Sequence, residues 1–346
     1  MSQTVIRGPY LDDLLRQPEA LLATHRSLLE TATGESARRL VHGTSWSRIV
    51  LTGMGASFHA LQPLTADLLA CGRVALRIET SELIHGAMAQ CRADTLLVVV
   101  SQSGASAEIL RLLDLNRHAT VLAVTNERDS PLAHRAAAVV LMQAGSEYSV
   151  SCKTYSATLM VLNWLGAIML GRDEQSVLSA LADIPQAVAG YLDRWETHVP
   201  QITQRLAGIR SLFLMGRGAS LAAVGAGSLI IKEAARFPAE GMSSAAFRHG
   251  PLEMLNAERF AIVLTGATPT ATLNMGLLTT IAHQGKSGEA LGPLAAFEPF
   301  HLPAVESGLL PFLEILPLQM TTLALAAMSG REAGRFEYLT KITDVE

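Results

Sequence analysis

Short apolar segments alternate with amphipathic segments along the chain. Between the apolar segments lie helical patterns such as "SFHALQPLTADLLACG" and "SAEILRLLDLNRH". Strands that alternate with helices are typical of a parallel sheet that helices cover on both faces. The pattern therefore predicts an α/β fold of the flavodoxin-like, three-layer type. The strand candidates of the first half are "SRIVLTGMG", "VALRIET", "TLLVVVSQSG", "ATVLAVTN" and "AVVLMQAG".

The same pattern restarts in the second half of the chain. There the glycine turn "MGRGAS", which ends at Ser220, resembles the turn "TGMGAS", which ends at Ser57. We interpret this likeness as an internal duplication that gives two tandem subdomains of similar topology. The second copy has no counterpart of "SQSGAS" after its next strand, "RFAIVLTGA", so we expect one site rather than two. The predicted organisation is an N-terminal helical segment (1–30), a first subdomain (31–172), a helical connector (173–200), a second subdomain (201–330) and a C-terminal tail (331–346).

Composition narrows the class of protein. Of the 346 residues, 49% are hydrophobic and 17% are charged, and the formal net charge of −4 argues against a nucleic-acid partner. The three cysteines, Cys71, Cys91 and Cys152, form no CxxC pair and stand at no zinc-ligand spacing. We therefore expect a cytoplasmic protein that holds neither a metal nor a cofactor.

No segment predicts a membrane partner. The most apolar long stretch, Thr158–Leu170, is shorter than the roughly 20 residues that span a bilayer. We expect a buried helix there. The N-terminal segment "MSQTVIRGPYLDDLL" lacks the apolar region of a signal peptide.

The segment "SQSGAS", Ser101–Ser106, follows an apolar strand and precedes a helix. In an open parallel sheet, ligands bind beyond the carboxyl ends of the strands. The unpaired N–H groups at a helix N-terminus attract anions. The turn "GMGAS", Gly53–Ser57, has the same setting. We interpret the hydroxyls and the amide as an anion site, although helix capping by Ser103 or Ser106 would account for a single serine.

A sugar phosphate fits these loops better than a nucleotide. A dinucleotide-binding turn carries G-x-G-x-x-G, but here Phe58 stands in the third position after Gly53 and Gly55. Glu79 lies near the distance expected for a ribose-binding acid, which is a weak signal alone. No P-loop lysine is present. A nucleotide-dependent oxidoreductase is therefore the weakest hypothesis.

Three residues outside the loops carry further chemistry. Glu233 lies on the helix after the second glycine turn, and His249 lies in "FRHGP", where Gly250 and Pro251 predict a turn. Lys341 is the one cation of "YLTKITDVE", a C-terminal segment whose alternating residues indicate that it packs down. A carboxylate and an imidazole near a sugar suit general acid–base catalysis. Each residue alone is more typical of an ordinary surface.

Together these motifs resemble the sugar isomerase (SIS) domain family. The chain resembles the isomerase half of glutamine–fructose-6-phosphate aminotransferase, and also its stand-alone relatives, which include amino-sugar-phosphate isomerases, deaminases and fructosamine-phosphate deglycases. The resemblance extends from about residue 45 to the last residue. Its motifs are "GMGAS", "SQSGAS", "AGSEYSVSCKTYSATL", "GRGAS", "IIKEAARFPAEGMSSAAFRHGPLEML" and "LTKITDVE".

The resemblance implies how the substrate is bound. The serines of "SQSGAS" match positions that bind the phosphate of the sugar. The loop that contains Cys152 matches one that lines the sugar, where the family often has serine in place of this cysteine. The implied substrate-binding residues are Ser57, Ser101, Gln102, Ser103, Ser106, Val150 and Cys152.

The resemblance also implies catalytic roles. Glu233 matches the base that moves a proton between C1 and C2 of the open-chain sugar through an enediol or enolamine. His249 matches the histidine assigned to ring opening, which in some members comes from the neighbouring subunit. Lys341 matches a tail lysine that closes over the site and handles protons or charge at O1 and O2. The synthase-type enzyme has a lysine where Ile230 stands, which weakens a claim of identical chemistry at C2.

The implied function is aldose–ketose isomerisation or deamination of a hexose or amino-sugar 6-phosphate, with no cofactor. No glutaminase half is seen, so we expect no use of glutamine as an ammonia source. A fructosamine-phosphate deglycase and a non-catalytic sugar-phosphate sensor remain alternatives. The roughly forty residues before the first strand are too few and not basic enough for a DNA-binding module, which disfavours the sensor. The resemblance further implies a homodimer with the site at the subunit interface.

Overall fold

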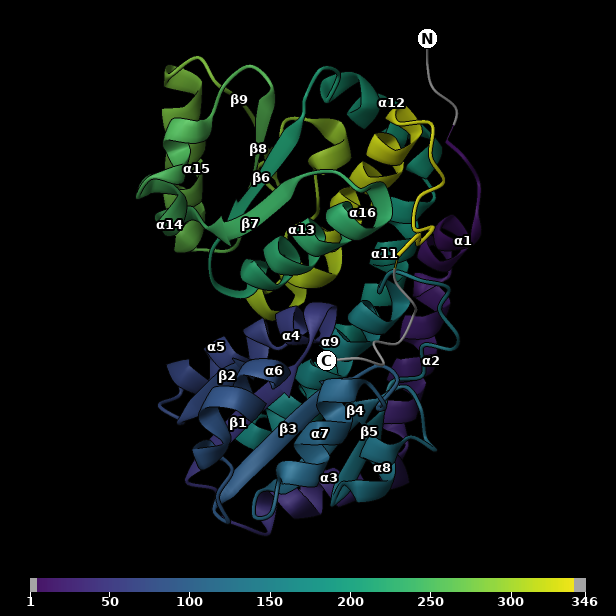
Figure 1. Cartoon of the computed structure of the whole chain (residues 1–346), viewed down its shortest axis with the longest axis vertical. Helices are drawn as coiled ribbons and strands as arrows, with labels where there is room; N and C mark the ends of the chain where they lie inside the picture. The colour runs from purple at the N-terminus through teal and green to yellow at the C-terminus, as the bar shows by residue number, and fades with distance from the viewer. Residues whose placement is uncertain (1–4, 339–346) are drawn as a thin grey trace. The chain divides into compact units, whose positions relative to one another are not determined.

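The computed structural model describes residues 5–338 of the chain, which form two compact units (Figure 1). We call them the N-terminal unit and the C-terminal unit. This division does not test the domain boundaries that the sequence analysis predicted, and they stay a prediction. The N-terminal unit comprises Arg16–Glu147 and Ser151–Pro185, with Tyr338 at its end, and the C-terminal unit comprises Gln186–Glu337 with Tyr148–Val150 and the segment up to Leu15.

The N-terminal unit is built on a five-stranded parallel sheet. Its strand order, β2-β1-β3-β4-β5, is the flavodoxin-like order. The central strand β3 is buried along its whole length, as its unbroken apolar sequence predicts. The strands are β1 (Arg48–Gly53), β2 (Ala75–Glu79), β3 (Thr95–Ser101), β4 (Thr120–Thr125) and β5 (Ala138–Leu141).

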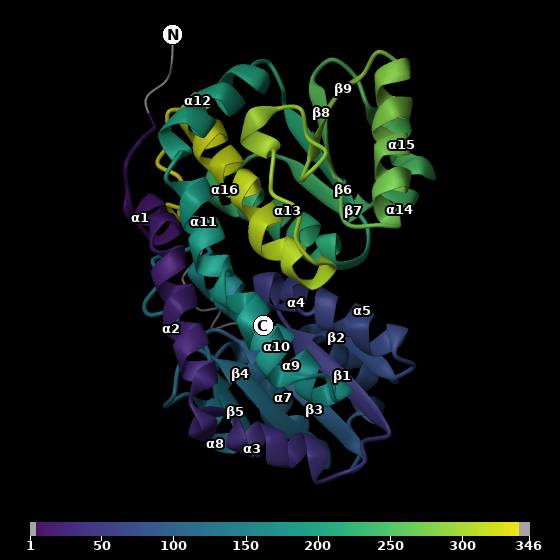
Figure 2. The same cartoon turned by 180° about the vertical axis from the view of Figure 1, so that it is seen from behind.

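Helices cover both faces of this sheet. Leu97 and Val99 of β3 pack with Ile109 and Leu112 of α7 on the face seen in Figure 1. Helix α9 lies on the opposite face, which Figure 2 shows. It contacts α2, α4, α5 and α10. The α-helices of this unit are α2 (Gln17–Leu29), α3 (Thr31–His42), α4 (Gly55–Ala60), α5 (Gln62–Ala70), α6 (Thr80–Glu82), α7 (Ala107–Leu115), α8 (Pro131–Arg135), α9 (Lys153–Leu170) and α10 (Glu174–Ala182).

The C-terminal unit repeats the arrangement with four parallel strands. Their order, β7-β6-β8-β9, corresponds to β2-β1-β3-β4 of the other sheet. The predicted fold class, α/β with two tandem subdomains, is therefore confirmed. The strands are β6 (Ser211–Gly216), β7 (Ala239–Ser243), β8 (Arg259–Leu264) and β9 (Ser287–Leu291), and the α-helices are α1 (Pro9–Leu15), most of α11 (Ile184–Leu192), α12 (Trp195–Arg205), α13 (Leu221–Ala235), α14 (Ser244–Arg248), α15 (Thr270–His283) and α16 (Leu310–Met328).

Two long helices of the chain are apolar, α9 and α16. The Thr158–Leu170 stretch does form a buried helix, within α9, as expected. The helix long and apolar enough to span a membrane, within the part of the chain that the structure describes, is α16 with the residues just before it. Residues 309–327 of it are all buried, and α16 packs against α12 and α13. Its apolar composition is therefore accounted for by its place in the core of the C-terminal unit.

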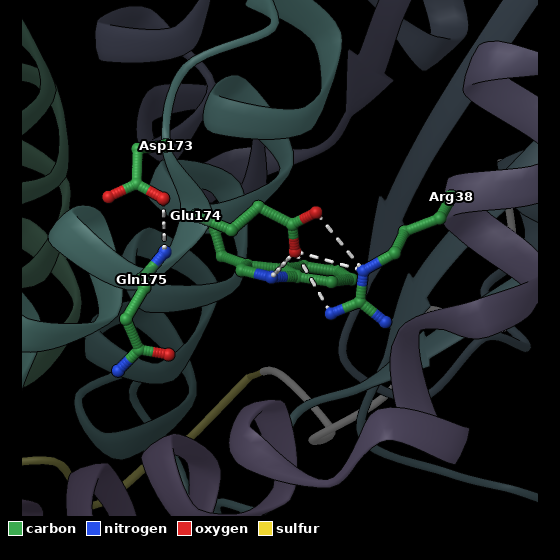
Figure 3. Close-up of polar contacts among 5 residues, drawn as sticks. Arg38, Asp173, Glu174 and Gln175 are labelled. Atoms are coloured by element: carbon green, nitrogen blue, oxygen red, sulfur yellow. Dashed lines mark hydrogen bonds and ion pairs between the residues drawn. The ribbon is translucent and has the colours of Figure 1, made fainter.

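A polar cluster joins three helices of the N-terminal unit (Figure 3). Arg38 on α3 donates from Nε to both carboxylate oxygens of Glu174 on α10, at 3.1 and 2.9 Å. Trp164 on α9 donates from Nε1 to the same carboxylate at 3.0 Å, and the Arg38 guanidinium lies 5.2 Å from the centre of the indole ring. Asp173 caps α10 by accepting from the backbone N–H of Gln175, as Figure 3 shows. One carboxylate thus holds α3 and α10 against α9.

We expect Glu174→Ala to lower the free energy of unfolding by about 1–3 kcal/mol, because the change leaves the Trp164 and Arg38 donors without their acceptor. Asp67→Ala is the control: it removes an exposed ion pair with Arg172 in the same unit, and such pairs contribute about 1 kcal/mol or less. Urea unfolding of wild type, Glu174→Ala and Asp67→Ala measures both losses of free energy. Equal losses in the two variants would contradict the role assigned to Glu174.

Candidate functional site

The two predicted ligand loops lie side by side at the carboxyl edge of the N-terminal sheet. Strands β1 and β3 are parallel neighbours, and Gly53 at the end of β1 pairs in register with Val100. A Cβ at Gly53 would lie 2.9 Å from the carbonyl oxygen of Val100 and 3.2 Å from the Cβ of Ser57. Glycine therefore permits the close approach of the Gly53–Ser57 turn to the strand that leads into the Ser101–Ser106 loop.

The backbone of the Ser101–Ser106 loop is held by the loop that follows β4. The carbonyl oxygen of Gln102 accepts from the Asn126 N–H at 3.1 Å and from the Thr125 hydroxyl at 3.2 Å. The carbonyl oxygen of Gly104 accepts from the Leu132 N–H at 3.1 Å. These bonds hold the loop from its outer side.

Gly104 makes this geometry possible. Its φ of +61° lies in the left-handed region, which residues with a side chain rarely adopt. A Cβ there would lie 2.3 Å from the Ser130 Oγ and 2.7 Å from the Ser130 Cβ. Both the backbone angle and the space therefore require glycine at this position.

The serine hydroxyls of the loop accept bonds from its own backbone. The Oγ of Ser101 accepts from the Gly104 N–H at 3.1 Å, and the Oγ of Ser103 accepts from the Ala105 N–H at 3.3 Å. A hydroxyl that accepts in this way still has its own hydrogen to donate. Ser106 occupies the N-cap position of α7, but its side chain makes no capping bond. Helix capping therefore does not explain the hydroxyl of Ser106, whereas an anion beyond the helix N-terminus would use it.

A cation that the sequence analysis missed lies beside the first glycine turn. The guanidinium of Arg77, on β2, lies 4.5 Å from the centre of the Phe58 ring, and Phe58 directly follows Ser57. Burial lowers the pKa of Arg77 from its usual value. An arginine ordinarily remains charged even so. Nothing in the local sequence distinguishes this arginine from a surface residue, because its position depends on the packing of β2 against α4.

The loop before α9 is organised by Glu147, a second residue that the sequence analysis missed. Its Oε1 accepts from the backbone N–H groups of Cys152, at 2.9 Å, and of Thr154, at 3.2 Å. Its Oε2 accepts from the Thr154 hydroxyl at 2.6 Å. The carboxylate thus caps α9, whose N-terminus favours negative charge. The side chains of Val150 and Cys152 are both buried, and their contact with a substrate stays a prediction.

The predicted catalytic residues Glu233 and His249 lie in the C-terminal unit. Glu233 is half-buried on α13, and His249 is exposed at the end of α14. The turn predicted after His249 is present, with φ of +142° at Gly250 and Pro251 at the start of a short 3₁₀ helix. Their catalytic roles stay predictions, as do the roles of the loop residues. Lys341 lies outside the described residues.

Within residues 5–338, no group of three or more histidine, cysteine, aspartate or glutamate side chains lies close enough together to hold a metal ion. All three cysteines are free thiols.

Comparison with known proteins shows which class of protein the chain is similar to. Residues 44–168 match the family model of the SIS domain. The isomerizing glutamine–fructose-6-phosphate aminotransferase of Pyrococcus horikoshii is 28% identical over 316 residues, which cover 87% of this chain and 52% of that protein. The resemblance predicted from the motifs is therefore confirmed, and it is to the SIS domain over residues 44–168.

Solved structures show the same fold. The C-terminal domain of glucosamine-fructose-6-phosphate aminotransferase from Francisella tularensis matches with a TM-score of 0.82 at 20% identity, over 95% of this chain and 98% of that one. Glucosamine-6-phosphate deaminase from Thermotoga maritima matches with a TM-score of 0.80 at 15% identity, over 98% of this chain and 100% of that one. This chain spans about half the length of the curated relatives it matches.

We expect Gly104→Ala to weaken sugar-phosphate binding at least about tenfold, which corresponds to ~1.4 kcal/mol, because the new Cβ displaces the loop from Ser130. Gly72→Ala is the matched control. Gly72 has a φ of +72°, but a Cβ there meets nothing within 4 Å. Calorimetric titration with fructose 6-phosphate measures both. Unchanged affinity in Gly104→Ala would show that the loop does not hold the ligand.

Proposed function

We propose that this chain is a phosphosugar isomerase or amino-sugar-phosphate deaminase that acts on a hexose or amino-sugar 6-phosphate. The observation that carries the proposal is the Ser101–Ser106 loop. It joins hydroxyls, a helix N-terminus and a rigid backbone at the carboxyl edge of a sheet within the SIS-matching segment. These are the groups that bind a phosphate. The names of the relatives, an aminotransferase that isomerises and a deaminase, support the reaction class.

In the proposed mechanism the loop serines, with Gln102 and Ser57, hold the phosphate and orient the open-chain sugar. Glu233 takes a proton from one carbon of the C1–C2 pair and returns it to the other, through an enediol or enolamine. A carboxylate suits this step because it takes and returns the proton on one face of the substrate. Val150 and Cys152 line the sugar.

His249 and Lys341 complete the proposed machinery. His249 opens the sugar ring, which moves a proton from the anomeric hydroxyl to the ring oxygen. Its exposure agrees with a contribution to the site of a second copy of the chain, in a homodimer. Lys341, which lies outside the described residues, handles charge at O1 and O2 in this proposal. Ile230 stands where the synthase-type enzyme has a lysine, which weakens a claim of identical chemistry at C2.

The function is tested by a panel of hexose 6-phosphates, hexosamine 6-phosphates and fructosamine phosphates. Ketose formation, ammonia release and amino-acid release are followed for each substrate. Ketose formation alone indicates an isomerase, ammonia release a deaminase, and amino-acid release a deglycase. Tight binding without any conversion would contradict the proposal and favour a sugar-phosphate sensor.

On the substrate that turns over, we expect Glu233→Gln to reduce kcat by about 10²–10⁴-fold, the usual contribution of a general base. KM should change little, because the phosphate contacts lie elsewhere. Glu240→Gln, at an exposed position of the same unit, is the control and should leave kcat unchanged. Full turnover by Glu233→Gln would exclude this carboxylate as the base.

A further inference from the structure

The second glycine turn has the backbone of the first. Gly218 has a φ of +60° and Gly55 a φ of +52°. A Cβ at Gly216 would lie 3.3 Å from the Cβ of Ser220, as one at Gly53 would lie 3.2 Å from the Cβ of Ser57. Each turn follows the corresponding strand of its sheet, β6 or β1. Ser220 is therefore the structural counterpart of Ser57.

The two serines have different surroundings. Ser57 is half-buried, whereas Ser220 is only 1% exposed. The hydroxyl of Ser220 donates to Oε1 of Glu314 at 2.8 Å. Glu314 comes from α16 and is itself 0% exposed. In the second turn the protein's own carboxyl therefore takes the serine contact.

The Glu314 carboxyl is neutral at neutral pH. Burial raises its pKa from 4.5 to about 8, and the hydrogen bond from Ser220 opposes this shift only in part. No nearby charge contributes, and Oε2 has no hydrogen-bond partner in the described part of the chain. The charged or titratable residues carried by the glycine turn and by the helices packed against α16 are Arg217, Lys232, Glu233, Glu196, His198 and Arg205.

The loop after β8, which corresponds to the Ser101–Ser106 loop, is held by a side chain of its own unit. Asn274 on α15 donates from Nδ2 to the carbonyl oxygens of Leu264 and Thr265, at 3.0 and 3.1 Å. Its Oδ1 accepts from the Ser244 hydroxyl at 2.8 Å. Asn274 and Ser244 are fully buried. Asn274 therefore holds the backbone of this loop from within the unit, and Glu314 holds the Ser220 hydroxyl of the glycine turn.

We propose that Glu314 is an internal ligand of the second glycine turn: its carboxyl takes the serine hydroxyl that the first turn presents to a substrate, and so keeps phosphate out of the C-terminal unit. The comparison with the first turn rests on the proposed function, whereas the closure of the second turn does not. Glu314 is a positioning residue here, because it acts through Ser220 on the start of α13.

The first test is the pH dependence of stability. Between about pH 5 and 8 the Glu314 carboxyl is protonated in the folded chain and ionised in the unfolded chain, so the stability it contributes is fully present below pH 4.5 and is lost as the pH rises towards 8. Glu314→Gln keeps the shape and removes the titration. The ratio of folded to unfolded chains should therefore be higher for Glu314→Gln than for wild type. The factor between the two ratios should grow by up to about tenfold per pH unit over this range.

Thermal unfolding at pH 5 and at pH 9 measures this effect. We expect equal Tm values for wild type and Glu314→Gln at pH 5, and a Tm of Glu314→Gln that is higher by at least roughly 2–4 °C at pH 9. Glu258→Gln, at an exposed position, is the control and should follow wild type at both pH values. A Glu314→Gln variant that follows wild type at both pH values would overturn the internal-ligand assignment.

The second test is the stoichiometry of inorganic phosphate binding, measured by calorimetry. We expect one phosphate per wild-type chain, lost in Gly104→Ala and kept in Ser220→Ala. Two phosphates per chain, or a phosphate lost in Ser220→Ala, would overturn the closure of the second turn. Wild type that binds no phosphate would count against the proposed function, and the pH test then decides the role of Glu314 separately.

Discussion

The left-handed backbone at Gly104 is the constraint on which the candidate site depends. It lets the Ser101–Ser106 loop pass within contact distance of Ser130, where the loop after β4 binds its carbonyl groups. Because the backbone is fixed from outside, the serine hydroxyls and the first turn of α7 keep their places without a ligand. A site arranged in this way before binding loses little conformational entropy when an anion arrives.

The two sheets share a strand order but differ at their carboxyl edges. In the N-terminal unit the turn after β1 and the loop after β3 carry half-buried hydroxyls, and Arg77 adds a positive charge beside them. In the C-terminal unit Glu314 accepts from the corresponding hydroxyl of Ser220, and Asn274 donates to the carbonyl oxygens of the loop after β8. In the proposed function, one arrangement of strands thus serves for binding in one unit and for support in the other. The supported helix, α13, is the one that carries Glu233.

The sequence predicted the elements that are buried on both sides. Strands β1, β3, β4, β6 and β8 are continuous apolar runs, and glycine marks the turns after β1, β3, β6 and β8. The edge strands β7, "AEGMS", and β9, "SGEAL", were missed, because strands with one open edge need few apolar residues.

The side chains of the candidate site also divide into those that a sequence pattern predicted and those that it missed. The loop serines are visible in sequence as a polar group after an apolar strand. Glu314 and Arg77 are single charged residues whose partners, Ser220 and Phe58, depend on packing between separate elements. Ser220 and Glu314 are far apart in the chain, so no local pattern relates them.

The central claim is that the Ser101–Ser106 loop holds the phosphate of a sugar phosphate. A crystal structure of the chain with bound fructose 6-phosphate tests it most directly. The account predicts phosphate oxygens within hydrogen-bond distance of the hydroxyls of Ser101, Ser103 and Ser106 and of the first N–H groups of α7. A phosphate bound at the turn that ends in Ser220, or a sugar bound with its phosphate away from this loop, would contradict it.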